Sequence, residues 1–348
     1  MKRIITAVVF ILALYSVAAF LVASPDREIS ELENRTLTKK KDISFNALDG
    51  RFQQSLESFT SDQFPFRDKL VCFQTGMLYA SGQREISGAY ICDDGRLIQV
   101  ITPSDIDEKK LVSLAKKVNR IAKNNAVYVM YVPSACVELK DKMPGGRSPY
   151  DYSALYEKLT SNLNNANIID LSASLTNPDF YYKTDHHWNI NGAYEAYRAF
   201  CNGRGVTPKA LESFKIKTVS TSFQGTLFSK APISKQTDEI KLPSVPELKV
   251  TADGKEIDFY SSDALETKDK YNVFQGGNHG IVEIENKKGN GKTLLIIKDS
   301  FANSFVPFIA GEYSKIVMLD ERYIFISLEE YVNTLSPDET LVLREIVN

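Results

Sequence analysis

Residues 292 to 311 read "KTLLIIKDSFANSFVPFIAG", and this stretch decides the fold class. Residues 292–298 form a short apolar run of the kind that is typical of a strand buried on both faces. The run ends in Lys298 and Asp299, and a helical pattern extends from Ser300 to Ala310. Ser300 therefore falls where strand turns into helix, at the carboxyl edge of the predicted sheet, which is the usual ligand side of an open α/β sheet.

The same alternation of strand and helix extends on both sides of this stretch. Strands are predicted at 126–133, 167–172, 292–298, 315–320 and 339–346, and helices at 105–124, 151–163, 190–200, 300–310 and 327–333, with Ser104 capping the first. Alternation at this length predicts an α/β fold built of βα units around a parallel sheet. Between about 210 and 285 the chain is β-rich and has no convincing long helix, which we interpret as an insertion into that fold.

The N-terminus predicts the compartment. Residues 4–23 carry no charge, and 20 apolar residues are about the length that a helix needs to cross a bilayer. Basic residues before the span and acidic residues after it favour a single-pass anchor in the cell membrane with the remainder exported. Cleavage of this segment as a signal peptide, which would give a secreted protein, stays open. The predicted domains are an anchor at 1–23, a tether at 24–46 and an α/β domain at 47–348 that includes a helical stretch from 48 to 80, broken at Pro65.

Composition excludes several classes of protein. The chain has 348 residues with 42 basic and 44 acidic side chains, a net charge of −2, so no large basic field exists for nucleic acid. The four cysteines are widely spaced and form no CxxC pair, which argues against a zinc ribbon. Export permits disulfides, and free buried thiols are the alternative. Nothing in the sequence calls for a cofactor.

A second stretch, residues 181–200, reads "YYKTDHHWNINGAYEAYRAF" and places two of the chain's three histidines side by side. A serine nucleophile needs a base, and that base needs an acceptor on its other ring nitrogen. In an extended segment residues i and i+2 project to the same side. Asp185 could then orient His187 toward Ser300, while His186 would point the opposite way. The alternative for Ser300 is a purely structural N-cap.

The two stretches together resemble the DHHW family. "TDHHWN" and "KDSFANS" carry the resemblance, supported by "ENRTLTKK" at 33–40, "FPFRDKL" at 64–70, "GGNHG" at 276–280 and "LDERY" at 319–323. The sequence is also similar to the catalytic domains of alginate O-acetylation proteins, within the SGNH hydrolase and acyltransferase group. The resemblance implies an SGNH-like, flavodoxin-like parallel sheet in which the Asp-x-His pair precedes the serine, the reverse of the usual order.

The resemblance also implies roles for individual residues. It assigns Ser300, His187 and Asp185 to a catalytic triad. Ordinary SGNH enzymes supply oxyanion donors from a glycine and an asparagine, which suggests Gly277 and Asn278 for that role. As further substrate contacts we consider His186 and Arg322, the latter next to Asp320. His279 is expected to be a loop residue.

The function that this resemblance implies is an extracytoplasmic serine O-acyltransferase that acts on a cell-surface or exported polysaccharide. A separate multi-span membrane acyltransferase would supply the acyl group, because a single span makes no channel. A carbohydrate esterase with the same triad and a non-catalytic glycan-binding surface protein are the alternatives. A metal site formed by Asp185, His186, His187 and His279 is a further interpretation, which we rank below the triad because adjacent histidines point apart in an extended chain.

Overall fold

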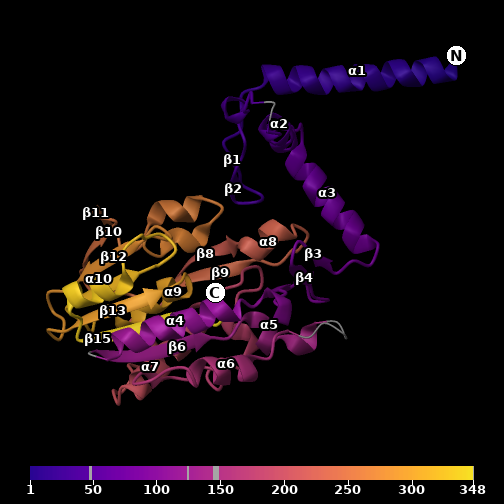
Figure 1. Ribbon diagram of the computed structural model, residues 1–348. Coiled ribbons are helices and arrows are strands. Elements are labelled where there is room, and N and C mark those ends of the chain that lie inside the picture. Colours follow the sequence, from indigo (N-terminus) through magenta and orange to yellow (C-terminus); the bar gives the residue numbers. More distant parts are fainter. Residues whose placement is uncertain (47–48, 124, 144–148, 348) are drawn as a thin grey trace. The chain divides into compact units, whose positions relative to one another are not determined.

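The computed structural model describes residues 1–46, 49–123, 125–143 and 149–347 (Figure 1). The predicted helix start at 48 and helix end at 124 therefore lie outside the described residues. The chain forms two compact units. The first contains residues 1–86 and 229–233, and the second contains residues 87–228 and 234–348.

The second unit is built on an eight-stranded sheet. Its strands, in spatial order, are β11 (Lys255–Ile257), β10 (Lys249–Ala252), β12 (Ile281–Glu285), β14 (Lys315–Leu319), β13 (Thr293–Lys298), β15 (Glu339–Glu345), β6 (Ala126–Val132) and β7 (Asn167–Ile168). Neighbours from β14 to β7 are parallel, and β12, β10 and β11 are antiparallel to their neighbours. The predicted parallel α/β sheet is confirmed.

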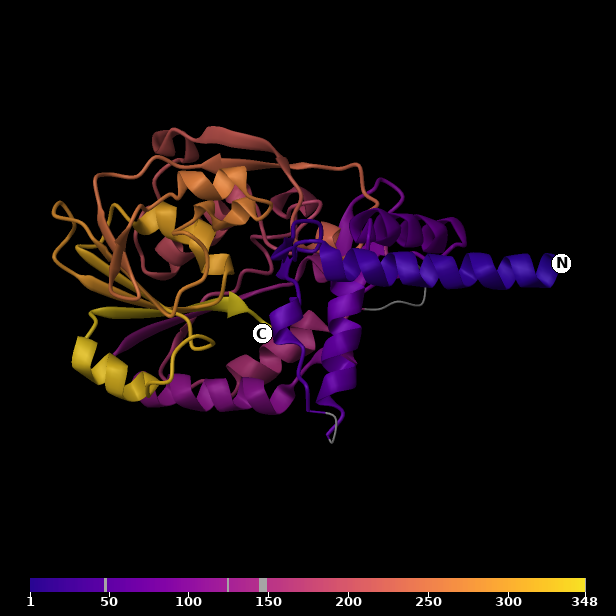
Figure 2. The same ribbon diagram turned by 90° about the horizontal axis from the view of Figure 1, so that it is seen from above.

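Helices cover both faces of this sheet (Figure 2). The helices of this unit are α4 (Glu108–Ile121), α5 (Ala135–Glu138), α6 (Tyr152–Thr160), α7 (Ile190–Gly203), α9 (Phe301–Ile309) and α10 (Leu328–Leu335), and the short α8 (Thr226–Lys230) follows β8. One face carries α4 and α10, which contact each other, and the other face carries α7 and α9, which also pack together. All nine residues of α9 are buried, as expected of a helix that is enclosed by the sheet and by α7.

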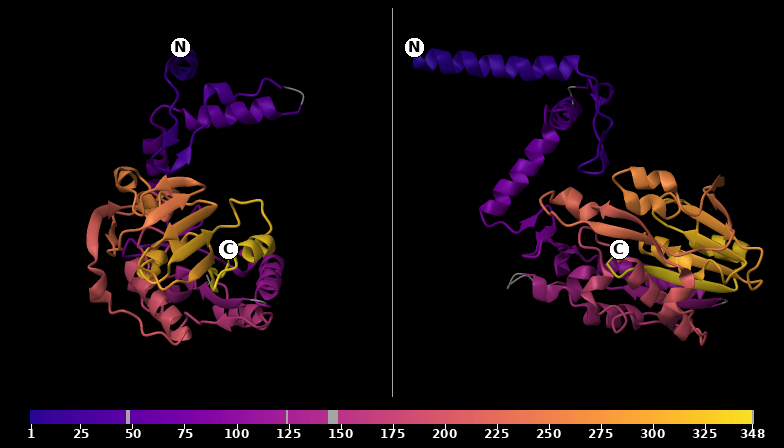
Figure 3. Two further views of the ribbon diagram at one scale, coloured as in Figure 1. Left: turned by 90° about the vertical axis from the view of Figure 1, so that its left-hand side faces the viewer. Right: turned by 180° about the vertical axis from the view of Figure 1, so that it is seen from behind.

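The β-rich stretch at 210–285 is confirmed as β-rich, but it divides into two parts. Strands β8 (Lys217–Phe223) and β9 (Asp238–Leu242) pair with each other in a separate two-stranded sheet. Strands β10, β11 and β12 instead continue the central sheet beyond β14 (Figure 3). Between the first unit and α4, β4 (Ala89–Ile91) and β5 (Leu97–Gln99) pair antiparallel as a hairpin.

Several predicted boundaries were wrong by three or four residues, and two of them have a clear local reason. The strand predicted at 167–172 ends at Ile168, because the Asp170 side chain accepts from the backbone N–H and hydroxyl of Ser172 and turns the chain. The helix predicted from 105 begins at Glu108. Its cap is Asp107, which accepts from two first-turn N–H groups, rather than Ser104.

The first unit contains the N-terminal helix α1 (Lys2–Ala23), the short strands β1 (Ile29–Ser30), β2 (Arg35–Thr36) and β3 (Glu85–Ile86), and helices α2 (Arg51–Asp62) and α3 (Arg67–Ala80). Helix α1 has 22 residues, about 33 Å, and among the described residues it is the one helix long and apolar enough to cross a membrane. The break between α2 and α3 falls at Pro65 as predicted.

The segment predicted as a tether is structured where it is described. Strands β1 and β2 pair antiparallel, and Arg35 donates two hydrogen bonds to the buried carboxylate of Asp62 in α2. Burial by itself raises the pKa of Asp62, but Arg35 and the Thr38 N–H together lower it to about 2. Arg67 pairs in turn with Glu33 at 2.7 Å. The motifs at 33–40 and 64–70 thus meet in one ion-pair network.

All four cysteines, Cys72, Cys92, Cys136 and Cys201, are free thiols, which is one of the two alternatives that the sequence left open. Burial raises the pKa of both Cys92 and Cys136 to about 12. A thiol with so high a pKa is a poor nucleophile. These two cysteines therefore serve as small apolar core residues.

Candidate active site

The two stretches singled out in the sequence meet because α7 and α9 run side by side in the same direction. Trp188, just before α7, contacts Phe301 at the start of α9, with ring centroids 5.3 Å apart. Further along, Tyr197 contacts Phe308 at 5.8 Å. Contacts that advance together along both helices require their N-termini to lie together. His187 and Ser300, 113 positions apart, are thereby brought to the same edge of the sheet.

The structure brings Asp185, His187 and Ser300 into one hydrogen-bonded chain. The Nδ1 atom of His187 lies 2.6 Å from Oδ1 of Asp185, and its Nε2 atom lies 2.7 Å from Oγ of Ser300. The side chain of Ser300 does not cap α9. Asp299 instead accepts from the Phe301 N–H at 3.0 Å. Ser300 occupies the N-cap position without capping through its side chain, so the purely structural interpretation is wrong, and its hydroxyl is directed at the imidazole.

Asp185 is held as a buried carboxylate. Only 2% of its surface is exposed, and its Oδ2 atom accepts from the Thr226 N–H at 2.7 Å and from the Thr226 hydroxyl at 3.0 Å. Burial by itself raises the pKa of Asp185, but the neighbouring His187 and His186 rings and the hydrogen bonds it accepts bring it well below the ordinary value. An ionised partner of this kind fixes the tautomer of the imidazole and stabilises its protonated form.

The β8–β9 hairpin fixes the loop that carries Asp185, a contact that the sequence analysis did not predict. Asp238, at the start of β9, accepts from the N–H groups of Lys183 and Thr184, both at 2.8 Å. The Thr184 hydroxyl accepts from the N–H of Gly225, which follows β8. A Cβ atom at Gly225 would lie 2.2 Å from Oδ2 of Asp185, so only glycine allows this approach. The hairpin is thus a clamp on the loop that carries Asp185 and His187.

Tyr271 and Trp188 fix the other two members of the chain. The Tyr271 ring stacks on His187, with centroids 4.2 Å apart and planes within 8°, and its hydroxyl donates to the Ser300 carbonyl at 3.0 Å. The fully buried indole of Trp188 donates to the Phe301 carbonyl at 3.1 Å and to the Ser304 hydroxyl at 2.9 Å. No sequence signal distinguishes Tyr271 from the other 16 tyrosines, whereas Trp188 is the single tryptophan.

The prediction that His186 points away from His187 was wrong. The Tyr182 N–H donates to the His187 carbonyl, which closes residues 182–187 into a bent loop instead of an extended segment. The two imidazole rings consequently lie 3.8 Å apart. His186 is half-buried, and its Nδ1 atom lies 2.8 Å from the Thr226 hydroxyl. It therefore borders the candidate site from the side of α8.

The same bend brings metal-ligand atoms together. One ligand atom each from Asp185, His186 and His187 lies within 4.8 Å of the others. Both carboxylate oxygens and both His187 ring nitrogens already have hydrogen-bond partners, so a metal ion would have to displace Thr226 or Ser300 contacts. His279, the fourth residue of that interpretation, instead contacts the Gln275 carbonyl at 3.0 Å within its own loop.

Gly277 and Asn278, the residues considered for an oxyanion hole, differ in their hydrogen bonding. The N–H of Gly277 donates to the Phe274 carbonyl at 3.1 Å and is therefore occupied. The exposed Asn278 has its side-chain oxygen 3.2 Å from the amide nitrogen of Asn303, in the first turn of α9. The backbone N–H groups of that turn are themselves hydrogen-bonded to Asp299 and to the Ser300 carbonyl. Asn278 therefore lies next to the first turn of α9, and its side-chain oxygen accepts a hydrogen bond from Asn303.

Arg322 is not part of the hydrogen-bonded chain of Ser300. It forms a two-pronged pair with Asp320, with N–O distances of 2.9 and 2.7 Å. Asp320 follows β14 at the carboxyl edge of the sheet and also lies 3.7 Å from the buried amino group of Lys298. The motif at 319–323 therefore contributes to the same edge as Ser300, beside it and not within the triad.

Comparison with known proteins places the chain among proteins of related fold. The family model described as "DHHW protein" matches residues 110–319. A crystal structure of a DHHW family protein from Eubacterium siraeum is 24% identical and superimposes with a TM-score of 0.65, covering 76% of this chain and 93% of that one. No curated protein matches the sequence.

Two further solved structures are similar. Bacillus cereus PatB1 with a sulfonyl adduct is 19% identical, with a TM-score of 0.61 over 73% of this chain and 93% of that one. The O-acetyltransferase domain of Pseudomonas putida AlgJ is 12% identical, with a TM-score of 0.47 over 74% of this chain and 91% of that one. The superpositions on the E. siraeum protein and on PatB1 confirm the predicted α/β fold.

Proposed function

This chain belongs to the DHHW family, and from that premise we propose that it is an extracytoplasmic serine-dependent O-acyltransferase, with acetyl as the acyl group and a cell-surface or exported polysaccharide as the acceptor. One observation carries the proposal. Asp185, His187 and Ser300 are joined by two short hydrogen bonds, of 2.6 and 2.7 Å, in the order that a nucleophilic triad requires.

In the first half-reaction the Ser300 hydroxyl attacks the acyl carbonyl of the donor while Nε2 of His187 takes its proton. Asp185 stabilises the imidazolium that forms. Collapse of the tetrahedral intermediate breaks the bond to the donor's leaving group, which receives the proton from His187. The products are an acyl-Ser300 ester and the free donor alcohol or thiol.

In the second half-reaction a sugar hydroxyl attacks the acyl-Ser300 carbonyl and gives its proton to His187. The new sugar ester is released, and the proton returns to the Ser300 oxygen. The developing oxyanion needs hydrogen-bond donors in both steps. We assign this role to the side-chain amide of Asn278, because its position beside Asn303 lies next to the helix turn that follows Ser300. The two helices that begin near Ser300 add positive potential from their N-termini.

The setting of the reaction follows from α1. A membrane-spanning α1 with a basic N-terminus would leave the α/β unit outside the cytoplasm. An acyl donor made inside the cell must then be passed across the membrane, and we propose a multi-span membrane acyltransferase as the partner that supplies it. The B. cereus PatB1 structure contains a sulfonyl adduct. Sulfonyl halides react with activated hydroxyls, so we expect Ser300 to react in the same way.

The test uses the full-length protein in detergent. Wild type and Ser300→Ala are incubated with p-nitrophenyl acetate or phenylmethylsulfonyl fluoride, and adducts are located by peptide mass spectrometry. We expect one adduct, on Ser300, and a loss of about 10⁴-fold or more in ester turnover for Ser300→Ala or His187→Ala. Ser213→Ala, at an exposed serine outside the site, is the matched control. Wild-type turnover by both triad variants contradicts the proposal.

Transfer and hydrolysis are separated by the fate of the acetyl group. With acetylated enzyme and an oligosaccharide acceptor, a transferase gives the sugar ester, whereas an esterase gives acetate whether or not the acceptor is present. Glycan binding that survives Ser300→Ala, without any trapped adduct in wild type, would instead favour a binding protein.

A further inference from the structure

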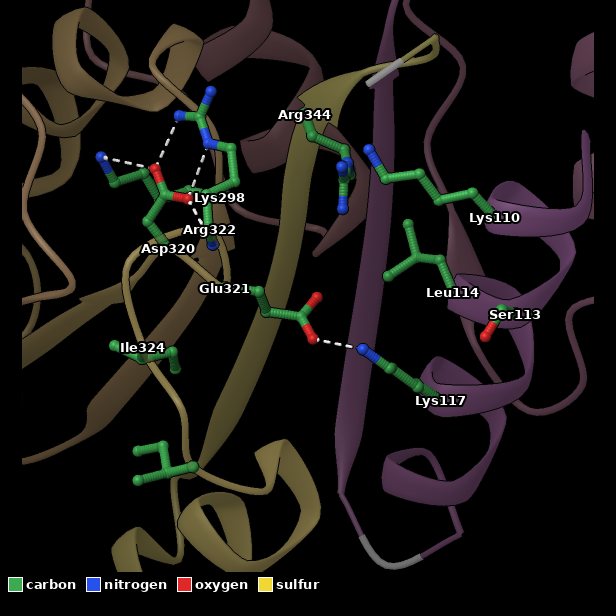
Figure 4. Close-up of a pocket in the computed structure, with 11 residues that line it drawn as sticks. Lys110, Ser113, Leu114, Lys117, Lys298, Asp320, Glu321, Arg322, Ile324 and Arg344 are labelled. Carbon is green, nitrogen blue, oxygen red and sulfur yellow. Dashed lines mark hydrogen bonds and ion pairs between the residues drawn. The ribbon is translucent and has the colours of Figure 1, made fainter. Parts of the chain in front are cut away.

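A cavity of about 460 Å³ opens beside the candidate active site, and neither Ser300 nor His187 lines it (Figure 4). Its walls come from α4, from the carboxyl ends of β13 and β15, and from the loop that follows β14. This volume lies in the usual range of small-molecule binding pockets, about 300–1,000 Å³. The position, at the carboxyl edge of the sheet, is where α/β folds bind ligands.

The lining of this cavity is strongly basic. Five of its side chains are cationic and two are anionic, which gives the lining a net charge of +3 in a chain whose total is −2. Both acids are engaged with basic neighbours. Glu321 pairs with Lys117 at 2.6 Å, and Asp320 forms the two-pronged pair with Arg322 (Figure 4).

The other three cations of the lining are Lys110, Lys298 and Arg344, and of these Lys298 also lies 3.7 Å from a carboxylate oxygen of Asp320. The amino group of Lys110 makes no hydrogen bond or ion pair with the part of the chain that the structure describes. Lys298 is almost completely buried, with 4% of its surface exposed. A concave basic site of this kind favours a bound carboxylate or phosphate, which charged hydrogen bonds from lysine and arginine recognise.

Lys298 connects the cavity to the candidate catalytic residues. Its Nζ atom donates to Oδ1 of Asn303 at 2.9 Å, and Asn303 contacts Asn278 at 3.2 Å. Lys298 is the last residue of β13 and precedes Ser300 by two residues, so the cavity and the candidate nucleophile share this strand end. A molecule anchored in the cavity would therefore extend past the first turn of α9 toward the Ser300 hydroxyl.

The remaining wall is apolar and completes a site for a sugar unit. Leu114 of α4 and Ile324 and Ile326 after β14 line it. Aliphatic side chains contact the carbon skeleton of a ligand, while a few polar groups fix its orientation. One side of the cavity thus suits a ring and the other an anionic substituent.

We propose that this cavity binds a carboxylate or phosphate group of the acyl-acceptor glycan, so that the acceptor is an acidic polysaccharide. The inference rests on the proposed function in one respect, namely that the ligand of the cavity is the molecule to which the acyl group is transferred. Neutral glycans lack the group that Lys110, Lys298 and Arg344 would hold.

The test measures binding to full-length Ser300→Ala protein, in nanodiscs of neutral lipid, by isothermal titration calorimetry. The probes are tetragalacturonate, its fully methyl-esterified form and an oligomer of glycerol phosphate. We expect one or both acidic probes to bind at least tenfold more tightly than the neutral ester, with an affinity that falls as salt is raised. The probe that binds tells whether the acceptor is a uronate or a phosphate polymer.

Charge-removing variants on one helix provide the matched comparison. Lys110→Gln removes a charge from the cavity, whereas Lys116→Gln removes the same charge from an exposed position of α4 outside it. Lys110→Gln should weaken binding of the acidic probe about tenfold, the effect of losing one charged hydrogen bond, and Lys116→Gln should leave it unchanged. Arg344→Gln should weaken it to a similar degree.

Three results would each overturn the inference. The first is that the neutral ester binds as tightly as the acidic probes, and the second is that Lys110→Gln and Lys116→Gln bind the acidic probe equally well. The third is that adding phosphatidylglycerol to the nanodiscs abolishes glycan binding, which would identify a lipid headgroup as the ligand. The proposed function is tested separately by the sulfonyl adduct on wild-type Ser300. An adduct without acidic-glycan binding contradicts only the inference, and binding without an adduct contradicts only the proposed function.

Discussion

Replacing Gly225 by alanine adds one methyl group behind the carboxylate of Asp185. The new Cβ would lie 2.2 Å from Oδ2 and 2.4 Å from Cβ of Asp185, whereas ordinary contacts begin at 3.4 Å. The backbone or the acid must therefore move by about 1.2 Å or more. Such a shift pulls Asp185 away from the Thr226 N–H, now at 2.7 Å, and from His187. Misplacing a catalytic group by about 1 Å can cost 10²-fold in rate.

We therefore expect Gly225→Ala to slow sulfonylation of Ser300 about a hundredfold, measured by intact mass spectrometry, while circular dichroism still reports a folded protein. Gly76→Ala in α3 is the matched control, because no atom beyond the neighbouring residues and backbone of its own helix lies within 4 Å of the added methyl group. Its rate should equal that of wild type.

A second comparison shows whether the effect acts through the acid. Asp185→Ala already removes the carboxylate, so adding Gly225→Ala to it should cost little further rate. Wild-type reactivity of Gly225→Ala, or a full additional hundredfold loss in the double variant, refutes the clamp described for the β8–β9 hairpin.

Three further variants test the residues around the triad. Tyr271→Phe keeps the ring that stacks on His187 and loses the hydroxyl that donates to the Ser300 carbonyl. We expect kcat to fall about fivefold, the effect of one hydrogen bond, with little change in KM. An unchanged kcat contradicts a positioning role for Tyr271. Trp188→Phe removes the indole donor to Phe301 and Ser304 and should lower Tm by several degrees, read by calorimetry against wild type. Burial, with the nearby Asp299 carboxylate, raises the pKa of Glu345 to about 7, against an unperturbed value of 4.5. The Glu345 carboxyl therefore stabilises the fold below about pH 4.5, and that contribution is lost as pH rises through about 7. In urea unfolding, the free energy of unfolding should fall more between pH 5 and pH 8 for wild type than for Glu345→Gln. An equal fall in the two proteins contradicts this prediction.

The fold could be predicted wherever local pattern and burial agree. The strand β13 and the helix α9 follow from one apolar run and one helical run with Ser300 at their junction. The ends of β7 and α4 did not, because a single aspartate in each case formed hydrogen bonds that competed with the continuing pattern.

The candidate site was predictable only in part, since its support comes from contacts between distant segments. Asp185, His187 and Ser300 were proposed from their residue types and the family resemblance. Gly225, Asp238 and Tyr271 could not be, because each acts through an approach that depends on the folded hairpin or loop and not on spacing along the chain. His186 was misjudged because the loop is closed by a backbone hydrogen bond, and an extended segment was assumed.

The reversed order of the motifs along the chain has a simple physical basis. The chemistry requires that the base and the nucleophile lie at the same edge of the sheet. Two helices that pack in the same direction bring their preceding loops to that edge, whichever of the two helices comes first in the sequence. Here α7 follows His187 and α9 follows Ser300, and the indole of Trp188 ties the two starts together through the Phe301 carbonyl. The second requirement, an acid fixed behind the base, is met by the β8–β9 hairpin and by Thr226. A β-rich segment between the base and the nucleophile is therefore part of the site, because Thr226 lies in that segment and donates both its N–H and its hydroxyl to the buried carboxylate of Asp185.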